Sequence, residues 1–190
     1  MTDDLSSVLT SLARPKFDPA LHDEQEFTPH AARGWTAWDA WSPEVEFCTF
    51  VGALQRMLQP QVIVETGVGT GRITQFLCLG EAKYFGFESD EKWRCNPDID
   101  YRPEPTPTVE QMAAAELIIL DSGVPYRLDE IALWASAGKH GSVCVIHDAG
   151  NGHPQDPQLV HNRVRAAIEL TDKPGMFLKN PRGAWIGLHR

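Results

Sequence analysis

One stretch constrains the fold of this chain more than any other: residues 62–71, which read VIVETGVGTG. A short apolar run that leads into glycines is typical of a buried parallel strand followed by a tight turn. Because glycine has no Cβ, the backbone N–H groups of such a turn can approach a ligand closely. The stretch therefore predicts a strand, a ligand-facing glycine loop and a helix that begins near Arg72 and ends near Leu79.

Short apolar runs recur along the rest of the chain and alternate with segments of helical periodicity. The expected strands are 62–65, 84–87, 117–120 and 143–146, with a shorter strand near 99–102. Besides 72–79, the expected helices are 43–58, 126–137 and 158–170. Two final apolar segments, 176–178 and 184–188, predict a β-hairpin. Strands that alternate with helices predict an α/β protein with a mostly parallel sheet.

The first 42 residues differ in character from the rest of the chain. Apolar spacing predicts a short helix over residues 2–14. Residues 16–42 are polar and aromatic, with three closely spaced tryptophans: Trp35, Trp38 and Trp41. We expect residues 1–42 to form an N-terminal arm, whose tryptophans either pack on the core or close as a lid over a substrate. Residues 43–190 are expected to form a single globular domain, because a chain of 190 residues can bury one core.

The charge and composition of the chain argue against nucleic acid, membranes and zinc as partners. The formal net charge of −9 would repel a phosphate backbone on average, so nucleic acid is not expected as a partner. No apolar run approaches the roughly 18 residues that cross a bilayer, and no signal-peptide pattern is present at the N-terminus. The four cysteines show no C-x-x-C spacing, so we expect no zinc site and a cytoplasmic location.

Four predicted parallel strands each end in a polar group: Glu65, Glu88, Asp121 and the pair His147-Asp148. Ligands bind at this edge of an open α/β sheet, so these side chains are candidates for a binding site. Glu88 follows the glycine loop at about the interval of a ribose-binding acid. Asp121 and Asp148 end strands that we expect to be neighbours, and two such carboxylates can share Mg²⁺. Histidine titrates near neutral pH, so His147 is either a proton acceptor or a buried structural histidine.

The pattern E-x-G-x-G-x-G, from Glu65 to Gly71, resembles motif I of the class I S-adenosylmethionine-dependent methyltransferases. The resemblance covers about residues 43–190 and implies a Rossmann-like, doubly wound, mostly parallel sheet of about seven strands with a C-terminal antiparallel β-hairpin. It also implies S-adenosylmethionine as the cofactor, with the ribose on Glu88. The cofactor-binding residues that it implies are Glu65, Gly67, Gly69, Gly71, Glu88, Ser89 and Asp121.

Within this family the chain looks most like the small-molecule O-methyltransferases. Some of these hold a metal with an acid after the fourth strand and an Asp-Asn pair after the fifth. In this chain Asp148 is followed by Ala149, so the sequence leaves open whether Asp121 and Asp148 hold Mg²⁺. Without a metal, we expect His147 or Asp148 to be the catalytic residue that accepts the proton of a substrate hydroxyl.

The sequence therefore favours S-adenosylmethionine-dependent methyl transfer to a small-molecule acceptor, at a hydroxyl oxygen. An NAD-dependent oxidoreductase is the first alternative, although its G-x-G-x-x-G fingerprint would need glycine where Arg72 stands. A non-catalytic S-adenosylmethionine-binding protein of the same fold is the second alternative. We expect no membrane partner, and the oligomeric state is open, with a homodimer among the options.

Overall fold

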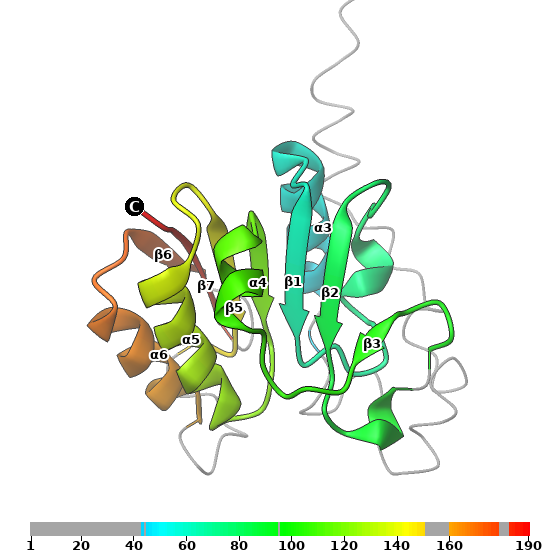
Figure 1. Cartoon of the computed structure of the whole chain (residues 1–190). Helices are drawn as coiled ribbons and strands as arrows, with labels where there is room; N and C mark the ends of the chain where they lie inside the picture. The colour runs from blue at the N-terminus through cyan, green and yellow to red at the C-terminus, as the bar shows by residue number, and fades with distance from the viewer. Residues whose placement is uncertain (1–42, 44, 95, 151–159, 179–182) are drawn as a thin grey trace, which may run out of the picture.

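The computed structural model describes residues 43, 45–94, 96–150, 160–178 and 183–190. Within them, seven strands form one sheet in the order β3-β2-β1-β4-β5-β7-β6 (Figure 1). The strands are β1 (Val62–Thr66), β2 (Lys83–Phe87), β3 (Tyr101–Arg102), β4 (Leu117–Leu120), β5 (Val143–His147), β6 (Gly175–Leu178) and β7 (Ala184–Leu188). The first five are parallel, whereas β7 runs antiparallel to both β5 and β6. This topology confirms the predicted Rossmann-like α/β fold with its C-terminal hairpin.

Helices cover both faces of the sheet (Figure 1). The helices are α3 (Val45–Leu58), α4 (Val109–Ala114), α5 (Tyr126–Ala137) and α6 (Val160–Leu170). Helix α3 lies on one face, and α4, α5 and α6 lie on the other, as a doubly wound sheet requires. The short α4 was missed at the sequence level, although Thr108 and Gln111 form a capping box at its start.

The two faces of the sheet alternate along each central strand. In β1, Ile63 packs in the cluster under α3, and Val64 packs in the cluster under α5. In β4, Ile119 packs in the cluster under α3, and Ile118 packs in the cluster under α5. Full burial of such a side chain stabilises the fold by roughly 1.5–3 kcal/mol. Because both faces are covered, these strands are uninterrupted apolar runs, and their carboxyl ends are held in fixed positions.

The segment after the glycine loop does not form the helix predicted over 72–79. It forms only the 3₁₀ helix η2 (Thr74–Phe76), flanked by turns and irregular backbone. The buried Arg72 donates from Nε to the Pro43 carbonyl oxygen at 2.9 Å. Neighbouring Ile73 is β-branched and therefore a weaker helix former. The long-range bond and the local propensity together favour a compact turn in place of a helix.

Two other boundaries also differ from the predictions. Helix α3 begins at Val45, whereas the prediction placed its first helical residue at Pro43. The carbonyl of Pro43 accepts the hydrogen bond from Arg72, which directs it away from the helix. The third strand is limited to Tyr101–Arg102, shorter than the predicted 99–102.

The predicted N-terminal arm, residues 1–42, lies outside the described residues together with its three tryptophans. The segments 151–159 and 179–182 also lie outside them. Across the described ranges, no helix has the length and apolar character needed to cross a membrane.

Candidate functional site

A cavity of about 280 Å³ lies at the carboxyl ends of β1, β2 and β4. Its lining comes mainly from the glycine loop after β1, the segment after β2 and the turn after β4. The lining residues are Gly67, Gly69, Thr70, Phe87, Glu88, Ser89, Asp90, Trp93, Pro105, Asp121, Ser122, Gly123, Val124 and Tyr126. Of the seven residues predicted to bind a cofactor, five line this cavity, and Glu65 and Gly71 do not.

The glycines of the loop meet different surroundings. A Cβ on Gly67 would collide with the backbone of Asp121, and a Cβ on Gly71 would collide with the side chain of Ile99. Gly69 differs, because the nearest atom to its Cβ position is the Gly67 carbonyl oxygen at 4.0 Å. Its φ of +56° nevertheless favours glycine. Gly67 is therefore required for packing against the backbone, and Gly71 is favoured by its φ of +84°. The space over Gly69 belongs to the cavity.

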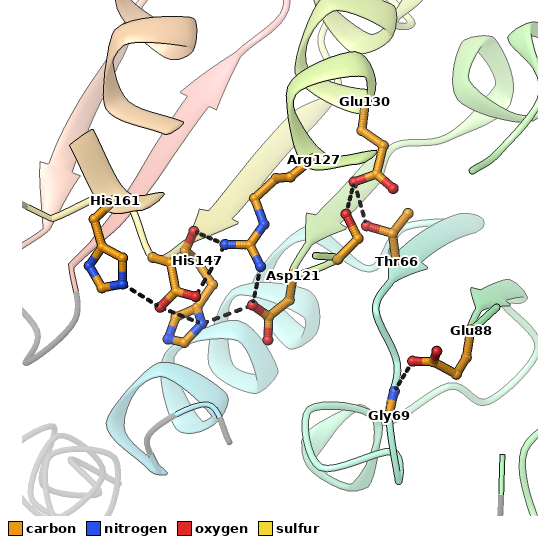
Figure 2. A network of polar contacts seen from close by, with 10 residues as sticks. Thr66, Gly69, Glu88, Asp121, Arg127, Glu130, His147 and His161 are labelled. Atoms are coloured by element: carbon orange, nitrogen blue, oxygen red, sulfur yellow. Dashed lines mark hydrogen bonds and ion pairs between the residues drawn. The ribbon is translucent and has the colours of Figure 1, made fainter. Parts of the chain in front are cut away.

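Glu88 follows β2 and lines the cavity beside the glycine loop (Figure 2). Its Oε2 accepts a hydrogen bond from the Gly69 N–H, and its Oε1 accepts one from the Asp90 N–H, both at 2.9 Å. Partial burial raises the pKa of the Glu88 carboxyl, and the two amide donors oppose this rise. Two backbone donors thus hold the carboxylate in a defined place on the cavity wall.

Glu65, another of the predicted cofactor-binding residues, lies in the core at the end of β1. Its side chain is fully buried and does not line the cavity, where the resemblance placed it near a bound cofactor. Its Oε2 accepts hydrogen bonds from Tyr84 Oη at 2.8 Å and from Thr74 Oγ1 at 3.0 Å. Burial raises the pKa of the Glu65 carboxyl to about 7. Glu65 therefore ties β2 and η2 to the end of β1, behind the loop.

Two acids and an arginine meet at the ends of β4 and β5 (Figure 2). The guanidinium of Arg127, from the first turn of α5, donates to Asp121 Oδ1 at 3.0 Å and to Asp148 Oδ2 at 3.2 Å. Its Nη1 also donates to the His147 carbonyl oxygen at 3.1 Å. Arg127 and Asp148 are buried, and Asp121 lines the cavity. The structure thus joins the two predicted acids through one arginine.

The ring of His147 completes this cluster. Its Nδ1 lies 2.9 Å from Asp121 Oδ1 and 3.4 Å from Asp148 Oδ1. Because an ionised carboxylate only accepts hydrogen bonds, we assign a hydrogen to Nδ1 of the ring. His147 is fully buried, with its ring centroid 4.4 Å from that of Phe47. Of the two residues predicted to be catalytic, His147 contacts the cavity-lining Asp121 directly, and Asp148 is joined to Asp121 through Arg127 and His147. Neither His147 nor Asp148 lines the cavity.

The same three residues are also a group of candidate metal ligands. One ligand atom from each of Asp121, His147 and Asp148 lies within 4.8 Å of the others. On the far side of Asp148, His161 Nε2 lies 3.5 Å from Asp148 Oδ1.

A second buried acid supports the cavity wall from behind. Glu130 Oε2 accepts hydrogen bonds from Thr66 Oγ1 at 2.9 Å and from Ser122 Oγ at 2.6 Å (Figure 2). Burial raises the pKa of the Glu130 carboxyl to about 7. Because Ser122 lines the cavity, this acid helps to hold the turn after β4 against the end of β1.

Arg127 and Glu130 were not among the residues that the sequence singled out. Both are buried on the face of α5 that also carries Ile131 and Trp134. The spacing i, i+3, i+4 and i+7 marks this face as the inward one. Charged residues on an inward face are rare unless they are paired. The position of Arg127 and Glu130 on the inward face of the predicted helix could therefore have identified them as paired, buried charges.

No protein-family model and no curated protein matches this sequence. Solved structures match over nearly the whole chain. The O-methyltransferase from Bacillus cereus in complex with S-adenosylhomocysteine (SAH) has a TM-score of 0.68 at 14% identity, over 98% of this chain and 97% of that chain. The O-methyltransferase TomG from Streptomyces achromogenes, involved in tomaymycin synthesis and solved with S-adenosylmethionine, has a TM-score of 0.64 at 15% identity, over 98% and 96%. The SAH-bound methyltransferase PaMTH1 from Podospora anserina has a TM-score of 0.59 at 12% identity, over 100% and 97%. At these identities the likeness shows a shared fold.

Proposed function

We propose that this protein transfers the methyl group of S-adenosylmethionine to a hydroxyl oxygen of a small molecule. The observation that carries the proposal is the cavity bounded by Gly69 and Glu88, at the sheet edge where open α/β folds bind ligands. The shared fold supports it, because neighbours of this fold were solved with S-adenosylmethionine or SAH.

The residues present fit this cofactor. The open space over Gly69 is a cradle that a side chain would fill. The Glu88 carboxylate lines the cavity and can accept hydrogen bonds from two ribose hydroxyls. Trp93, Val124 and Tyr126 add an apolar lining that suits a purine ring.

When bound, S-adenosylmethionine supplies a methyl carbon made electrophilic by its positive sulfur. An acceptor hydroxyl forms the new C–O bond as the C–S bond breaks, and the hydroxyl proton must leave. Positioning supplies most of the acceleration in such an in-line displacement. The protein's part is therefore to orient the acceptor and to take up one proton.

The Asp121–His147 pair is the proposed proton acceptor. Asp121 is the member of the buried cluster that reaches the cavity, and its Oδ1 lies 2.9 Å from His147 Nδ1. Asp148 pairs with Arg127 and does not line the cavity, so we assign it the role of holding that arginine. His147 then acts through Asp121, and this refines the sequence-level choice between His147 and Asp148.

Calorimetric titration with SAH, repeated with NAD⁺, tests the cofactor. We expect SAH to bind and NAD⁺ not to bind, because Arg72 stands at the third glycine position of the dinucleotide fingerprint and its side chain is buried. Binding of NAD⁺ without SAH would instead establish the oxidoreductase alternative.

Radiolabelled methyl transfer to a panel of hydroxylated small molecules tests the activity. We expect transfer to at least one acceptor, and loss of that transfer in His147→Ala with SAH affinity retained. Binding of SAH with no transfer to any member of a broad panel would favour the non-catalytic alternative.

Several sequence expectations stay predictions. They are the arm-and-domain division at residue 42, the absence of a nucleic-acid partner, the homodimer and the cytoplasmic location.

A further inference from the structure

The guanidinium of Arg127 lies between the two carboxylates that the sequence offered as ligands for Mg²⁺ (Figure 2). Its side chain is 4% exposed, and those of Asp121 and Asp148 are 8% and 9% exposed. An arginine keeps its positive charge at any pH that a protein tolerates. A permanent cation is therefore part of the cluster, supplied by the chain itself.

The oxygens of the two carboxylates are largely occupied by protein groups. Asp121 Oδ1 lies 3.0 Å from Arg127 and 2.9 Å from His147. Asp148 Oδ2 lies 3.2 Å from Arg127, while its Oδ1 lies 3.4 Å from His147 and 3.5 Å from His161. Mg²⁺ requires oxygen ligands in near-octahedral geometry at about 2.1 Å, usually with several waters. The donor set as it stands does not fit a divalent cation, because the positively charged arginine contacts one oxygen of each carboxylate.

Charge leads to the same conclusion. Two buried carboxylates side by side repel each other unless a positive charge compensates them. Arg127 provides that charge and contacts all three members of the cluster, since it also donates to the His147 carbonyl oxygen at 3.1 Å. A planar guanidinium fixes direction as well as charge, because its N–H groups point along defined axes. Asp121 and His147 are thereby held in one arrangement at the cavity edge.

We propose that Arg127 is the internal cation of this site, a positioning residue that takes the place of a divalent metal, so that the protein works without one. The inference deepens the proposed function and rests on it for the meaning of the site. Its structural part, that Arg127 excludes a metal from Asp121, His147 and Asp148, is tested independently of turnover.

The first experiment measures Mn²⁺ binding to the EDTA-treated wild-type protein by electron paramagnetic resonance, with and without SAH. We expect no saturable Mn²⁺ binding, and an SAH affinity that neither EDTA nor Mn²⁺ changes. One Mn²⁺ bound per chain and lost in Asp121→Asn would overturn the proposal. Failure of SAH to bind would count against the proposed function alone, because the Mn²⁺ result decides about Arg127.

The second experiment removes the arginine. Arg127→Ala should gain one Mn²⁺ per chain, because it frees a donor set whose atoms lie within 4.8 Å of one another. Methylguanidinium should displace this Mn²⁺, because both cations compete for the same place. The matched control is Arg165→Ala, which breaks a partly exposed pair with Glu169 and should bind no Mn²⁺.

A folded Arg127→Ala protein that gains no Mn²⁺, or whose Mn²⁺ resists methylguanidinium, would contradict the proposal. Arg127→Met keeps the bulk of the side chain without its charge, and it serves as the second variant if the alanine protein does not fold. The same gain of Mn²⁺ is expected for it, but methylguanidinium should not displace this Mn²⁺, because the methionine side chain leaves no room for a second guanidinium.

Discussion

The acids at the carboxyl ends of β1 and β4 lie on neighbouring parallel strands, yet they meet opposite kinds of partner. Glu65 in β1 accepts hydrogen bonds from the uncharged hydroxyls of Thr74 and Tyr84, and burial raises its pKa to about 7. Asp121, just past β4, contacts the guanidinium of Arg127 and the imidazole of His147. The first environment favours a neutral carboxyl. The second places a guanidinium 3.0 Å from the carboxylate oxygen.

An acid at a strand end is therefore not by itself evidence for contact with a ligand. Both acids follow the same sequence pattern, an apolar strand that ends in a carboxylate. Neighbouring side chains decide which of them reaches the cavity. In Glu65 the carboxyl is a buried structural group, whereas in Asp121 it lines the cavity and is held by a cation.

Removing the cation should have the largest effect. Arg127→Ala leaves Asp121 and Asp148 buried without their partner, and we expect it to lower the free energy of unfolding by about 3–5 kcal/mol. Urea denaturation measures this loss. Arg165→Ala, which breaks a partly exposed pair with Glu169 and a contact with the Phe177 ring, should cost less than about 2 kcal/mol. Equal losses in the two variants would mean that the buried pairing has no special weight.

The next prediction tests whether the cofactor occupies the open space over Gly69. Gly69→Val should weaken SAH binding by about 100-fold or more, close to 3 kcal/mol, because the new side chain enters the open space of the cavity. Gly80→Val is the matched control, since Gly80 also has a positive φ and open space around its Cβ position but does not line the cavity. Similar SAH affinities in both folded variants would refute the loop as the cofactor cradle.

Local sequence patterns sufficed for much of the fold. The bounds of α5 were predicted as observed, and those of β5 within one residue, because apolar periodicity and flanking glycines are visible over short windows. Glu88 and Gly69 were placed on the cavity for the same reason, since their spacing along the chain is part of the pattern. By contrast, η2 replaced a predicted helix because Arg72 bonds to Pro43, 29 residues away.

The cluster at the site was harder to predict because its bonds are also long-range. Arg127 meets Asp148 across 21 residues, and His147 meets Asp121 across 26. These residues are too far apart in the sequence for a local pattern to pair them. Each acid was therefore predicted separately, as a metal ligand or as a catalytic residue. The pairing of Asp121 and Asp148 through an arginine becomes visible only when the strands are side by side.

The third test compares the two glutamates that were both predicted to bind the cofactor. Glu88→Ala should weaken SAH binding by about 1–3 kcal/mol, the usual loss for a hydrogen bond to a charged group. Glu65→Gln should leave SAH affinity nearly unchanged, because its side chain does not line the cavity. Glu91→Ala, at an exposed position near Glu88, is the control for a simple change of charge. If calorimetry showed a larger loss of SAH affinity in Glu65→Gln than in Glu88→Ala, Glu65 and not Glu88 would be the cofactor-binding glutamate.

The last prediction concerns the pH dependence of stability that Glu65 imposes. The pKa of about 7 means that the Glu65 carboxyl keeps its proton in the folded state up to about pH 7, whereas in the unfolded chain it loses the proton near the ordinary pKa of 4.5. Between these values the folded state binds more protons, so stability falls as the pH rises. The contribution is fully present below about pH 4.5 and is lost as the pH rises through about 7. One such group contributes a slope of at most about 1.4 kcal/mol per pH unit.

Glu65→Gln replaces the titrating acid with a neutral group of the same shape, and it should flatten this slope. Urea unfolding across the window from about pH 4.5 to about pH 8 measures the change. Glu130→Gln should flatten the slope similarly, because burial also raises the pKa of Glu130 to about 7. The exposed Glu91→Gln should leave it unchanged. If Glu65→Gln kept the full wild-type slope, Glu65 would be ionised in the folded protein, and the contrast between the ends of β1 and β4 would lose its electrostatic basis.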